Sequence, residues 1–137
     1  MRIFLDANIL FSAAFSNGAI RRLIHDIRNA SHTVVVNRYV IDEALRNISI
    51  HRSESLAILH EITASMEVVP TRLKLPTSVR GIALPEKDVP VLATALSSRC
   101  DVLMTGDVRH FGTLFGTTVG GTAIHSPVGT ARMLFGG

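Results

Sequence analysis

Short apolar runs alternate along the chain with longer stretches of helical periodicity. The clearest helical repeat, with apolar positions spaced i, i+3, i+4 and i+7, begins at Ile20 and ends at Ile27, and it predicts an amphipathic helix. Further helices are predicted around residues 40–48, 56–62 and 88–96 and directly after Pro127. The runs that predict strands are residues 2–5, 33–36, 67–69, 102–104 and 122–125.

The residue pattern within the predicted strands indicates how they are buried. Residues 3–5, 34–36 and 102–104 are apolar without alternation, as expected of strands that are covered on both faces. Strands that alternate with helices form mostly parallel sheets. We therefore predict an α/β fold, a three-layer α/β/α sandwich with a mostly parallel central sheet, as a single domain over residues 1–137. Residues 70–85 contain Pro76 and Gly81 and predict a surface loop.

Composition limits the function classes. With 47% apolar and 18% charged residues, the chain is too hydrophobic to be intrinsically disordered. It holds one cysteine, Cys100, which fits a reducing compartment. No apolar run is long enough to span a membrane, and Asp6 interrupts the N-terminal apolar stretch too early for a signal peptide. We expect a cytoplasmic protein.

The charge balance is basic and rich in arginine. The formal net charge is +3, and 12 of the 14 basic residues are arginine. Arginine binds phosphate in a bidentate way, which suits a nucleic-acid ligand. A GC-rich genome gives the same composition, so composition alone leaves both interpretations open.

Acidic residues fall where ligand sites form in parallel sheets. Asp6 directly follows the first strand, and Asp107 follows residues 102–104 across Thr105 and Gly106. Ligands bind outside the carboxyl ends of such strands. Asp88 stands where it can cap a helix, as Ser53 does earlier in the chain, and Glu43 lies within a predicted helix.

Each of these acids alone has a plain structural role, in a turn, a cap or a solvated helix face. Converging carboxylates repel one another and raise each other's pKa unless a cation neutralises them. Oxygen ligands without clustered Cys or His favour Mg²⁺ or Mn²⁺. The six histidines show no zinc-type spacing. His110, three residues past Asp107, is the histidine best placed to reach the rim of such a site.

Four segments in order resemble the PIN-domain family. They are RIFLDANIL (2–10), KDVPVLATA (87–95), DVLMTGDVRHF (101–111) and IHSP (124–127). The resemblance implies a PIN-like fold and a metal-dependent endoribonuclease of the VapC-like type, the toxin of a toxin–antitoxin pair. It implies Mg²⁺ or Mn²⁺ as cofactor and an acidic quartet, both catalytic and metal-binding, of Asp6, Glu43, Asp88 and Asp107. Asp42 is an alternative to Glu43, and Glu86 is a possible rival of Asp88.

The resemblance also implies supporting residues and partners. Asn8 and Thr105 match polar positions beside the acids, and Arg46 and Arg109 are candidates for RNA contacts. RNA would be the substrate, and a cognate antitoxin and a second copy of the chain would be partners. An apolar surplus around Ala13, Ala14, Phe15, Ile20 and Ile24 predicts a surface that is paired with a second copy or with a partner helix.

Two further interpretations remain open, a non-catalytic PIN-fold module that binds RNA or protein and a structure-specific DNA nuclease. A receiver-like phosphoacceptor is disfavoured, because it needs adjacent acids after the first strand and a lysine at a late strand end. The chain has Leu5-Asp6-Ala7 after that strand, and its two lysines, Lys74 and Lys87, stand elsewhere.

Overall fold

The computed structural model describes residues 1–79 and 81–136 and contains a six-stranded sheet. The strand order is β3-β2-β1-β4-β6-β5. All neighbouring strands are parallel except the last pair, β5 and β6, which is antiparallel. The bounds are β1 Arg2–Leu5, β2 Thr33–Asn37, β3 Glu67–Val69, β4 Val102–Met104, β5 Thr118–Val119 and β6 Thr122–His125.

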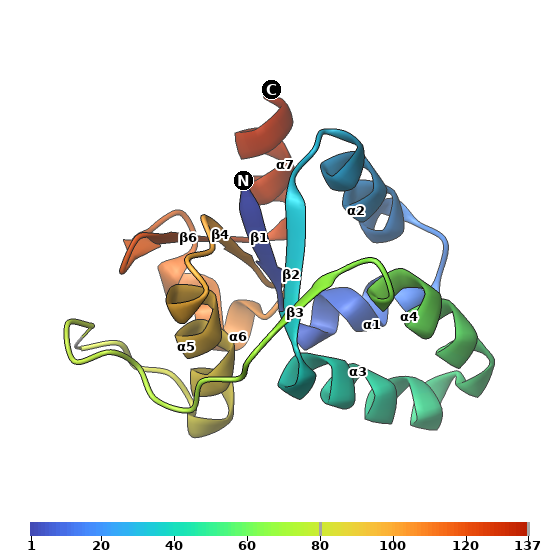
Figure 1. Cartoon of the computed structure of the whole chain (residues 1–137), viewed down its shortest axis with the longest axis horizontal. Coiled ribbons are helices and arrows are strands. Elements are labelled where there is room, and N and C mark those ends of the chain that lie inside the picture. The colour runs from blue at the N-terminus through green and yellow to red at the C-terminus, as the bar shows by residue number, and fades with distance from the viewer. Residues whose placement is uncertain (80, 137) are drawn as a thin grey trace.

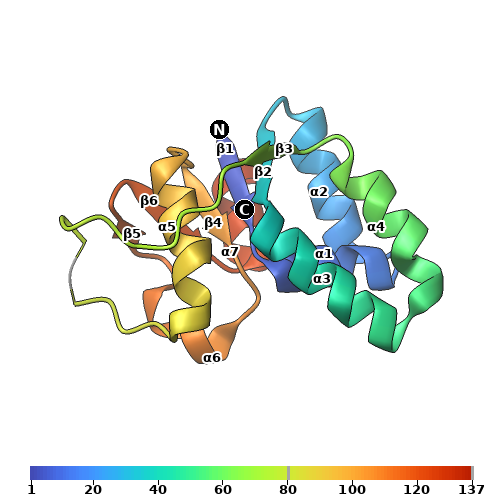
Figure 2. The ribbon, with the colours of Figure 1, turned by 60° about the horizontal axis from the view of Figure 1, so that its bottom comes forward.

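Helices cover both faces of this sheet (Figure 1). Their bounds are α1 Ala7–Phe15, α2 Ala19–Asn29, α3 Arg38–His51, α4 Leu56–Thr63, α5 Val89–Ser97, α6 Val108–Phe111 and α7 Pro127–Phe135. Helices α5 and α7 lie on opposite sides of β4, and α2 contacts both β2 and α7. Helices α1 to α4 gather at one end of the molecule, away from the β5–β6 hairpin (Figure 2), and α3 contacts α5 between them. The predicted three-layer α/β/α fold is confirmed.

The centre of the sheet explains why the apolar runs lack alternation. Phe4 of β1 lies opposite Val35 of β2 and Leu103 of β4, and all three side chains are fully buried. A strand covered by helices on both faces has no solvent side on which a polar residue is favoured. All five predicted strands are present, and β2 extends one residue further, to Asn37.

Three elements were missed by the periodicity analysis: helix α1, the four-residue helix α6 and strand β5. Helix α1 begins directly after Asp6 and is apolar nearly all round, because it packs against α2, α3 and α4 at once. Its half-exposed face carries Phe11 and Phe15 as well as polar residues, so its apolar positions show no clear amphipathic repeat. Strand β5 has only two residues and joins β6 through Gly120 and Gly121, which both have positive φ.

Two predicted helix caps are wrong. Ser53 belongs to a short 3₁₀ turn, Ser53–Ser55, that precedes α4, and its side chain makes no cap hydrogen bond. Asp88 ends a second 3₁₀ turn, Glu86–Asp88, that runs directly into α5. Because the backbone is already helical at Asp88, its carboxylate caps nothing and is directed elsewhere.

The apolar surplus near the N-terminus is mostly internal. Ala13, Ala14 and Ile24 are buried in the core of the chain itself, and Phe15 and Ile20 pack partly against that core. They are therefore not a spare apolar surface. The large apolar side chains that are exposed on α7 are Val128, Met133 and Phe135.

Other expectations can be compared directly with the structure. Residues 70–79 and 81–85 contain neither helix nor strand, as predicted for a loop. Cys100 is buried between α5 and β4. Within the described residues, none of the helices combines the length and apolar character needed to cross a membrane.

Candidate active site

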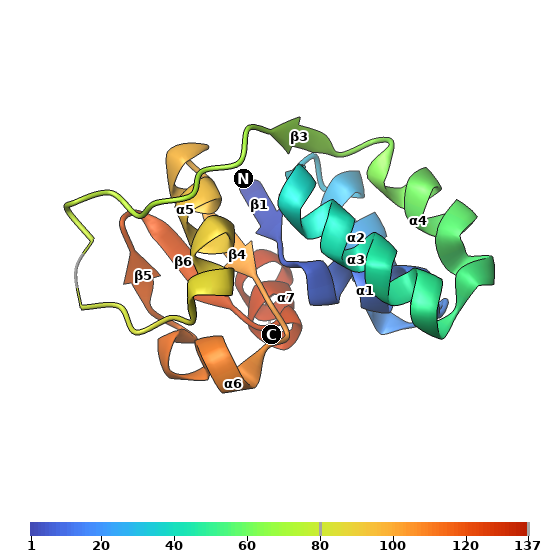
Figure 3. The ribbon, with the colours of Figure 1, turned by 90° about the horizontal axis from the view of Figure 1, so that it is seen from below.

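The acidic residues gather where the strand order reverses. Strand β1 lies at the centre, with β2 on one side and β4 on the other, and ligand sites of open α/β sheets form at such a point beyond the carboxyl ends of the strands. Figure 3 looks onto this end of the molecule, with α5 and α6 on one side of β1 and α1 and α3 on the other. Asp6 follows β1, Asp107 follows β4, Glu43 is on α3, and Asp88 immediately precedes α5.

Asp6 is held by donors from three directions. One carboxylate oxygen accepts a hydrogen bond from the backbone N–H of Ala7 at 2.7 Å. The other accepts from the Thr105 hydroxyl at 2.8 Å and from the Asn8 amide at 3.1 Å. Only 3% of Asp6 is exposed. Its orientation is therefore fixed by the protein itself.

Asn8 and Thr105 also fix the loop that follows β4. The Asn8 side-chain oxygen accepts from the backbone N–H of Gly106 at 2.7 Å, and Thr105 Oγ1 accepts from that of Asp107 at 3.1 Å. A Cβ at Gly106 would lie 3.2 Å from the same Asn8 oxygen, which explains why glycine suits this position. The two side chains thus connect Asp6 to the segment that carries Asp107.

Burial raises the pKa of Asp6 to about 6, because a carboxylate loses its hydration there. The hydrogen bonds from Thr105 and Ala7 oppose the rise, and the charges of Asp88 and Glu43 add to it. The mutual repulsion expected from the sequence is present, but burial is the larger cause. The electrostatic coupling also places Asp88 and Glu43 within range of Asp6.

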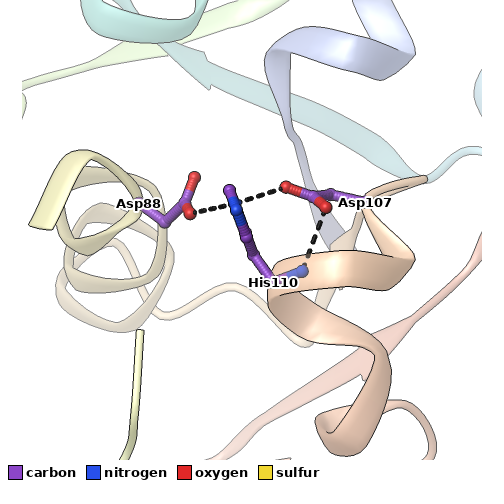
Figure 4. Close-up of side chains that lie close together, drawn as sticks. All are labelled: Asp88, Asp107 and His110. Atoms are coloured by element: carbon purple, nitrogen blue, oxygen red, sulfur yellow. Dashed lines mark hydrogen bonds and ion pairs between the residues drawn. The ribbon is translucent and has the colours of Figure 1, made fainter. Parts of the chain in front are cut away.

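The imidazole of His110 lies between the carboxylates of Asp88 and Asp107 (Figure 4). Its Nδ1 is 2.7 Å from Asp88 Oδ2 and 2.9 Å from Asp107 Oδ2. The second oxygen of Asp107 accepts from the backbone N–H of His110 at 3.1 Å and so caps α6. The ligand atoms of these three residues all lie within 4.8 Å of one another.

Asp88 is buried at this cluster, with 8% of the residue exposed. Burial raises its pKa, His110 opposes the rise, and the Asp107 carboxylate adds to it. Among the described residues, Asp88 Oδ2 and His110 Nδ1 have no partner with hydrogen-bond geometry, despite their short contact. The proposed rival of Asp88, Glu86, is exposed in the preceding turn.

Glu43 and Asp42 point to different environments on α3. Glu43 is half-buried and lines a cleft of about 270 Å³ together with Asn8, Phe11, Asn47 and His51. Asp42 forms an exposed ion pair with Arg38, one turn earlier, at 3.5 Å. The cleft containing Glu43 therefore includes Asn8, a direct hydrogen-bond partner of Asp6, and Asp42 is turned toward solvent.

The two candidate arginines differ in their setting. Arg46 is exposed on α3, one turn after Glu43, and lies close enough to Tyr39 to lower its pKa against the raising effects of burial, Glu43 and Asp88. Arg109 is exposed on α6, next to His110. Neither side chain is held in a buried ion pair.

The sequence analysis did not predict the contacts that three residues make at the site: His110, Tyr39 and Asn37. His110 was expected at the rim, but it contacts two of the acids. The Tyr39 hydroxyl donates to the backbone carbonyl of Lys87 and so connects α3 to the turn before Asp88. Asn37 is fully buried, caps α3 by accepting from Val40, and donates to Thr94 of α5 at 2.9 Å. An Asn at the end of a strand and before a helix is the only sequence signal for this role.

Comparison with solved structures shows the fold. No protein-family model matches the chain, and no curated protein matches it. A chain of VapBC2 from Rickettsia felis, solved bound to a DNA fragment from the promoter, aligns at 14% identity with a TM-score of 0.70. The alignment covers 92% of this chain and 98% of that one.

Two further structures are similar. A chain of VapBC-1 from nontypeable Haemophilus influenzae aligns at 15% identity and a TM-score of 0.60, covering 93% of this chain and 99% of that one. A chain of FitAB bound to an IR36 DNA fragment aligns at 14% identity and 0.56, covering 91% and 94%. These likenesses confirm the PIN-like fold that the four sequence segments predict.

Proposed function

We propose that this protein is a Mg²⁺- or Mn²⁺-dependent endoribonuclease and the toxin of a toxin–antitoxin pair. The observation that carries the proposal is the cluster of Asp88, Asp107 and His110 beside the buried carboxylate of Asp6. Buried acids this close together are costly unless a cation or a proton neutralises them. The orphaned oxygen of Asp88 is the group in this cluster that a cation would satisfy.

The residues fit a hard divalent cation. Asp88 and Asp107 would hold it directly, with Asp6 and Glu43 completing the acidic surround. When bound, Mg²⁺ or Mn²⁺ supplies Lewis-acid polarisation of a phosphate and acidifies a water molecule. Thr105, Asn8 and the Ala7 N–H keep one orientation of Asp6, so that no reorganisation is needed when substrate arrives.

The rest of the chain suits a polyanion. Without the four proposed acids, 14 basic residues stand against 7 acidic ones, which gives +7. Arg46 and Arg109 are exposed beside the site and would contact the RNA backbone, so we expect affinity to fall as salt rises. We propose RNA as the substrate because of the VapC-like fold. DNA is the competing substrate.

The test is cleavage of end-labelled single-stranded RNA by the purified chain with Mg²⁺, Mn²⁺ or EDTA. We expect cleavage with either cation, none in EDTA, and none by Asp6→Asn with either cation. Duplex and single-stranded DNA are assayed in parallel. Cleavage of DNA alone would replace RNA as the substrate, and tight RNA binding without any cleavage would favour the non-catalytic module.

We also propose an antitoxin and a second copy of the chain as partners. The similar structures are named as VapBC and FitAB assemblies, and this supports the antitoxin. Induced expression should arrest growth, and co-expression of a small DNA-binding protein encoded beside the gene should relieve the arrest. Light scattering tests the homodimer, since a mass of 14.8 kDa that is unchanged on concentration would contradict it.

A further inference from the structure

The contact of His110 with the two carboxylates is not that of an ordinary hydrogen-bonded histidine. Its Nδ1 is nearly equidistant from Asp88 Oδ2 and Asp107 Oδ2, at 2.7 and 2.9 Å. One N–H points directly at only one of two acceptors, or is shared between them in a weaker three-centre bond. Within the described part of the chain, neither Nδ1 nor Asp88 Oδ2 has a partner with hydrogen-bond geometry.

The spacing of these atoms is that of ligands around one ion. Adjacent ligands of an octahedral cation with bonds of about 2.1 Å are roughly 3 Å apart. The two contacts of Nδ1 are close to that value, and the three ligand atoms all lie within 4.8 Å of one another. Only 8% of the Asp88 residue is exposed, and its Oδ2, which has no hydrogen bond among the described residues, is directed at the His110 ring (Figure 4).

The fold holds the imidazole in this place. Asp107 caps α6 through its other oxygen, which accepts from the backbone N–H of His110. Residues three apart in the first helical turn lie on the same side, so the cap directs the His110 ring back over Asp107. Only 20% of the His110 side chain is exposed, and it comes close to Asp88 of the neighbouring element.

We propose that His110 is itself a ligand of the divalent cation, through Nδ1, together with Asp88 and Asp107. The inference rests on the proposed function and adds a nitrogen to an otherwise oxygen-only site. Imidazole is a ligand of transition metals, whereas Mg²⁺ takes oxygen ligands and keeps several waters. The site therefore discriminates in favour of Mn²⁺ and Co²⁺ over Mg²⁺.

The test measures metal binding by the full chain, without substrate. Mn²⁺ titrations followed by electron paramagnetic resonance give the affinity, and electron spin echo modulation detects a directly bound ¹⁴N. We expect a nitrogen coupling in the wild-type protein and none in His110→Ala, with Mn²⁺ affinity about 10–100-fold weaker in the variant. Mg²⁺ affinity, measured by calorimetry, should fall much less.

Two further variants complete the design. His60→Ala, on the exposed side of α4, is the matched histidine control and should retain both affinity and coupling. His110→Gln offers an oxygen in place of the nitrogen, so it should bind Mg²⁺ like the wild type and lack the coupling. Circular dichroism checks that each variant is folded, and the wild-type echo spectrum decides the question even if His110→Ala is not.

The outcomes separate the two proposals. Tight Mn²⁺ binding without a nitrogen coupling, unchanged in His110→Ala, would overturn the role of His110 and leave the proposed nuclease intact. A wild-type chain that binds neither Mn²⁺ nor Mg²⁺ would overturn both.

Discussion

The two halves of the acidic site are built in opposite ways. Around Asp6, three protein donors point at one carboxylate, and both of its oxygens are satisfied. Around Asp88 and Asp107, the His110 ring contacts both carboxylates and the His110 N–H donates to Asp107 alone, so an oxygen of Asp88 remains without a hydrogen bond among the described residues.

The difference shows which half is complete. A buried polar atom that lacks a partner costs about 1–3 kcal/mol, so a protein retains one where something else is to bind. In the Asp6 half, hydrogen bonds within the protein fix the orientation of the carboxylate. The half formed by Asp88, Asp107 and His110 is the open half, where a cation would supply the missing interactions.

The largest effect is expected from the open half. Asp107→Asn should lower RNA cleavage about 10³-fold, or about 4 kcal/mol, because it removes charge from the group that positions a cation. The asparagine oxygen can still cap α6, so the fold should remain. Asp42→Asn is the control, since that acid is exposed and paired with Arg38. A large loss of thermal stability in EDTA would indicate that Asp107 is mainly a turn residue.

For the Asp6 half, we expect an effect on how the free energy of unfolding depends on pH. The folded pKa of Asp6 is about 6 against 3.8 for the free group, so the folded state binds the extra proton between these values. Stability in EDTA should therefore fall as pH rises from about 4 to 6, by about 3 kcal/mol from this residue. Above pH 6, Asp6 is ionised and the full free-energy cost of burying its charge remains.

Asp6→Asn removes that dependence. Its free energy of unfolding relative to wild type, from urea titrations in EDTA, should become more favourable from pH 4 to pH 7. The absolute difference also includes hydrogen bonds lost to Thr105 and Asn8, so the change with pH is the quantity to compare. A difference that stays constant over this range would mean that Asp6 titrates normally.

The neighbouring acids Glu43 and Asp42 on α3 allow a site variant to be compared with a matched control. Glu43 lines the cleft that also includes Asn8, whereas Asp42 faces Arg38. Glu43→Gln should weaken cleavage about 10–100-fold, as expected for an outer group of a metal site, and Asp42→Asn should leave it unchanged. The reverse ranking would assign the second acid to Asp42.

The smallest expected effect is a difference in stability between losing a hydrogen bond to a charged acceptor and losing one to a neutral acceptor. Thr105→Val removes the hydroxyl that donates to Asp6, and it should cost about 2 kcal/mol at pH 7. Thr122→Val, equally buried but bonded to the neutral Cys100 carbonyl, should cost about 1 kcal/mol. At pH 4.5, where Asp6 is protonated, the loss for Thr105→Val should move toward that for Thr122→Val. The part that remains includes the hydrogen bond from the Asp107 N–H to Thr105, so a gap in urea unfolding that does not change with pH would contradict this explanation.

Much of the sheet could be predicted because burial leaves a direct trace in the sequence. The apolar runs that contain Phe4, Val35 and Leu103 are strands covered on both faces. Helix α1 left no such trace, because its half-exposed face also carries the apolar residues Phe11 and Phe15, so no polar face reveals its period. Strand β5, with two residues, is too short for any pattern to develop.

The sequence indicated which acids lie near one another at the site, but it did not indicate which side chains contact each other there. Asp6 and Asp107 follow strands that pair in the sheet, so their proximity follows from topology. Asp88 was read as a cap, because nothing in the spacing indicates the 3₁₀ turn that frees its side chain. His110 reaches the acids through the cap of α6, which templates based on pairs of histidines do not detect.

The pairing of β1 with β4 has a consequence for synthesis. Asp6 bonds Thr105, which lies 99 residues later, and the backbone N–H of Thr105 in turn donates to the carbonyl of His125 on β6. An emerging chain therefore carries Asp6 and Glu43 long before the segment that orients them exists. The pocket closes only when nearly the whole polypeptide has left the ribosome, and a prematurely terminated product that ends before β4 would lack both Asp107 and His110.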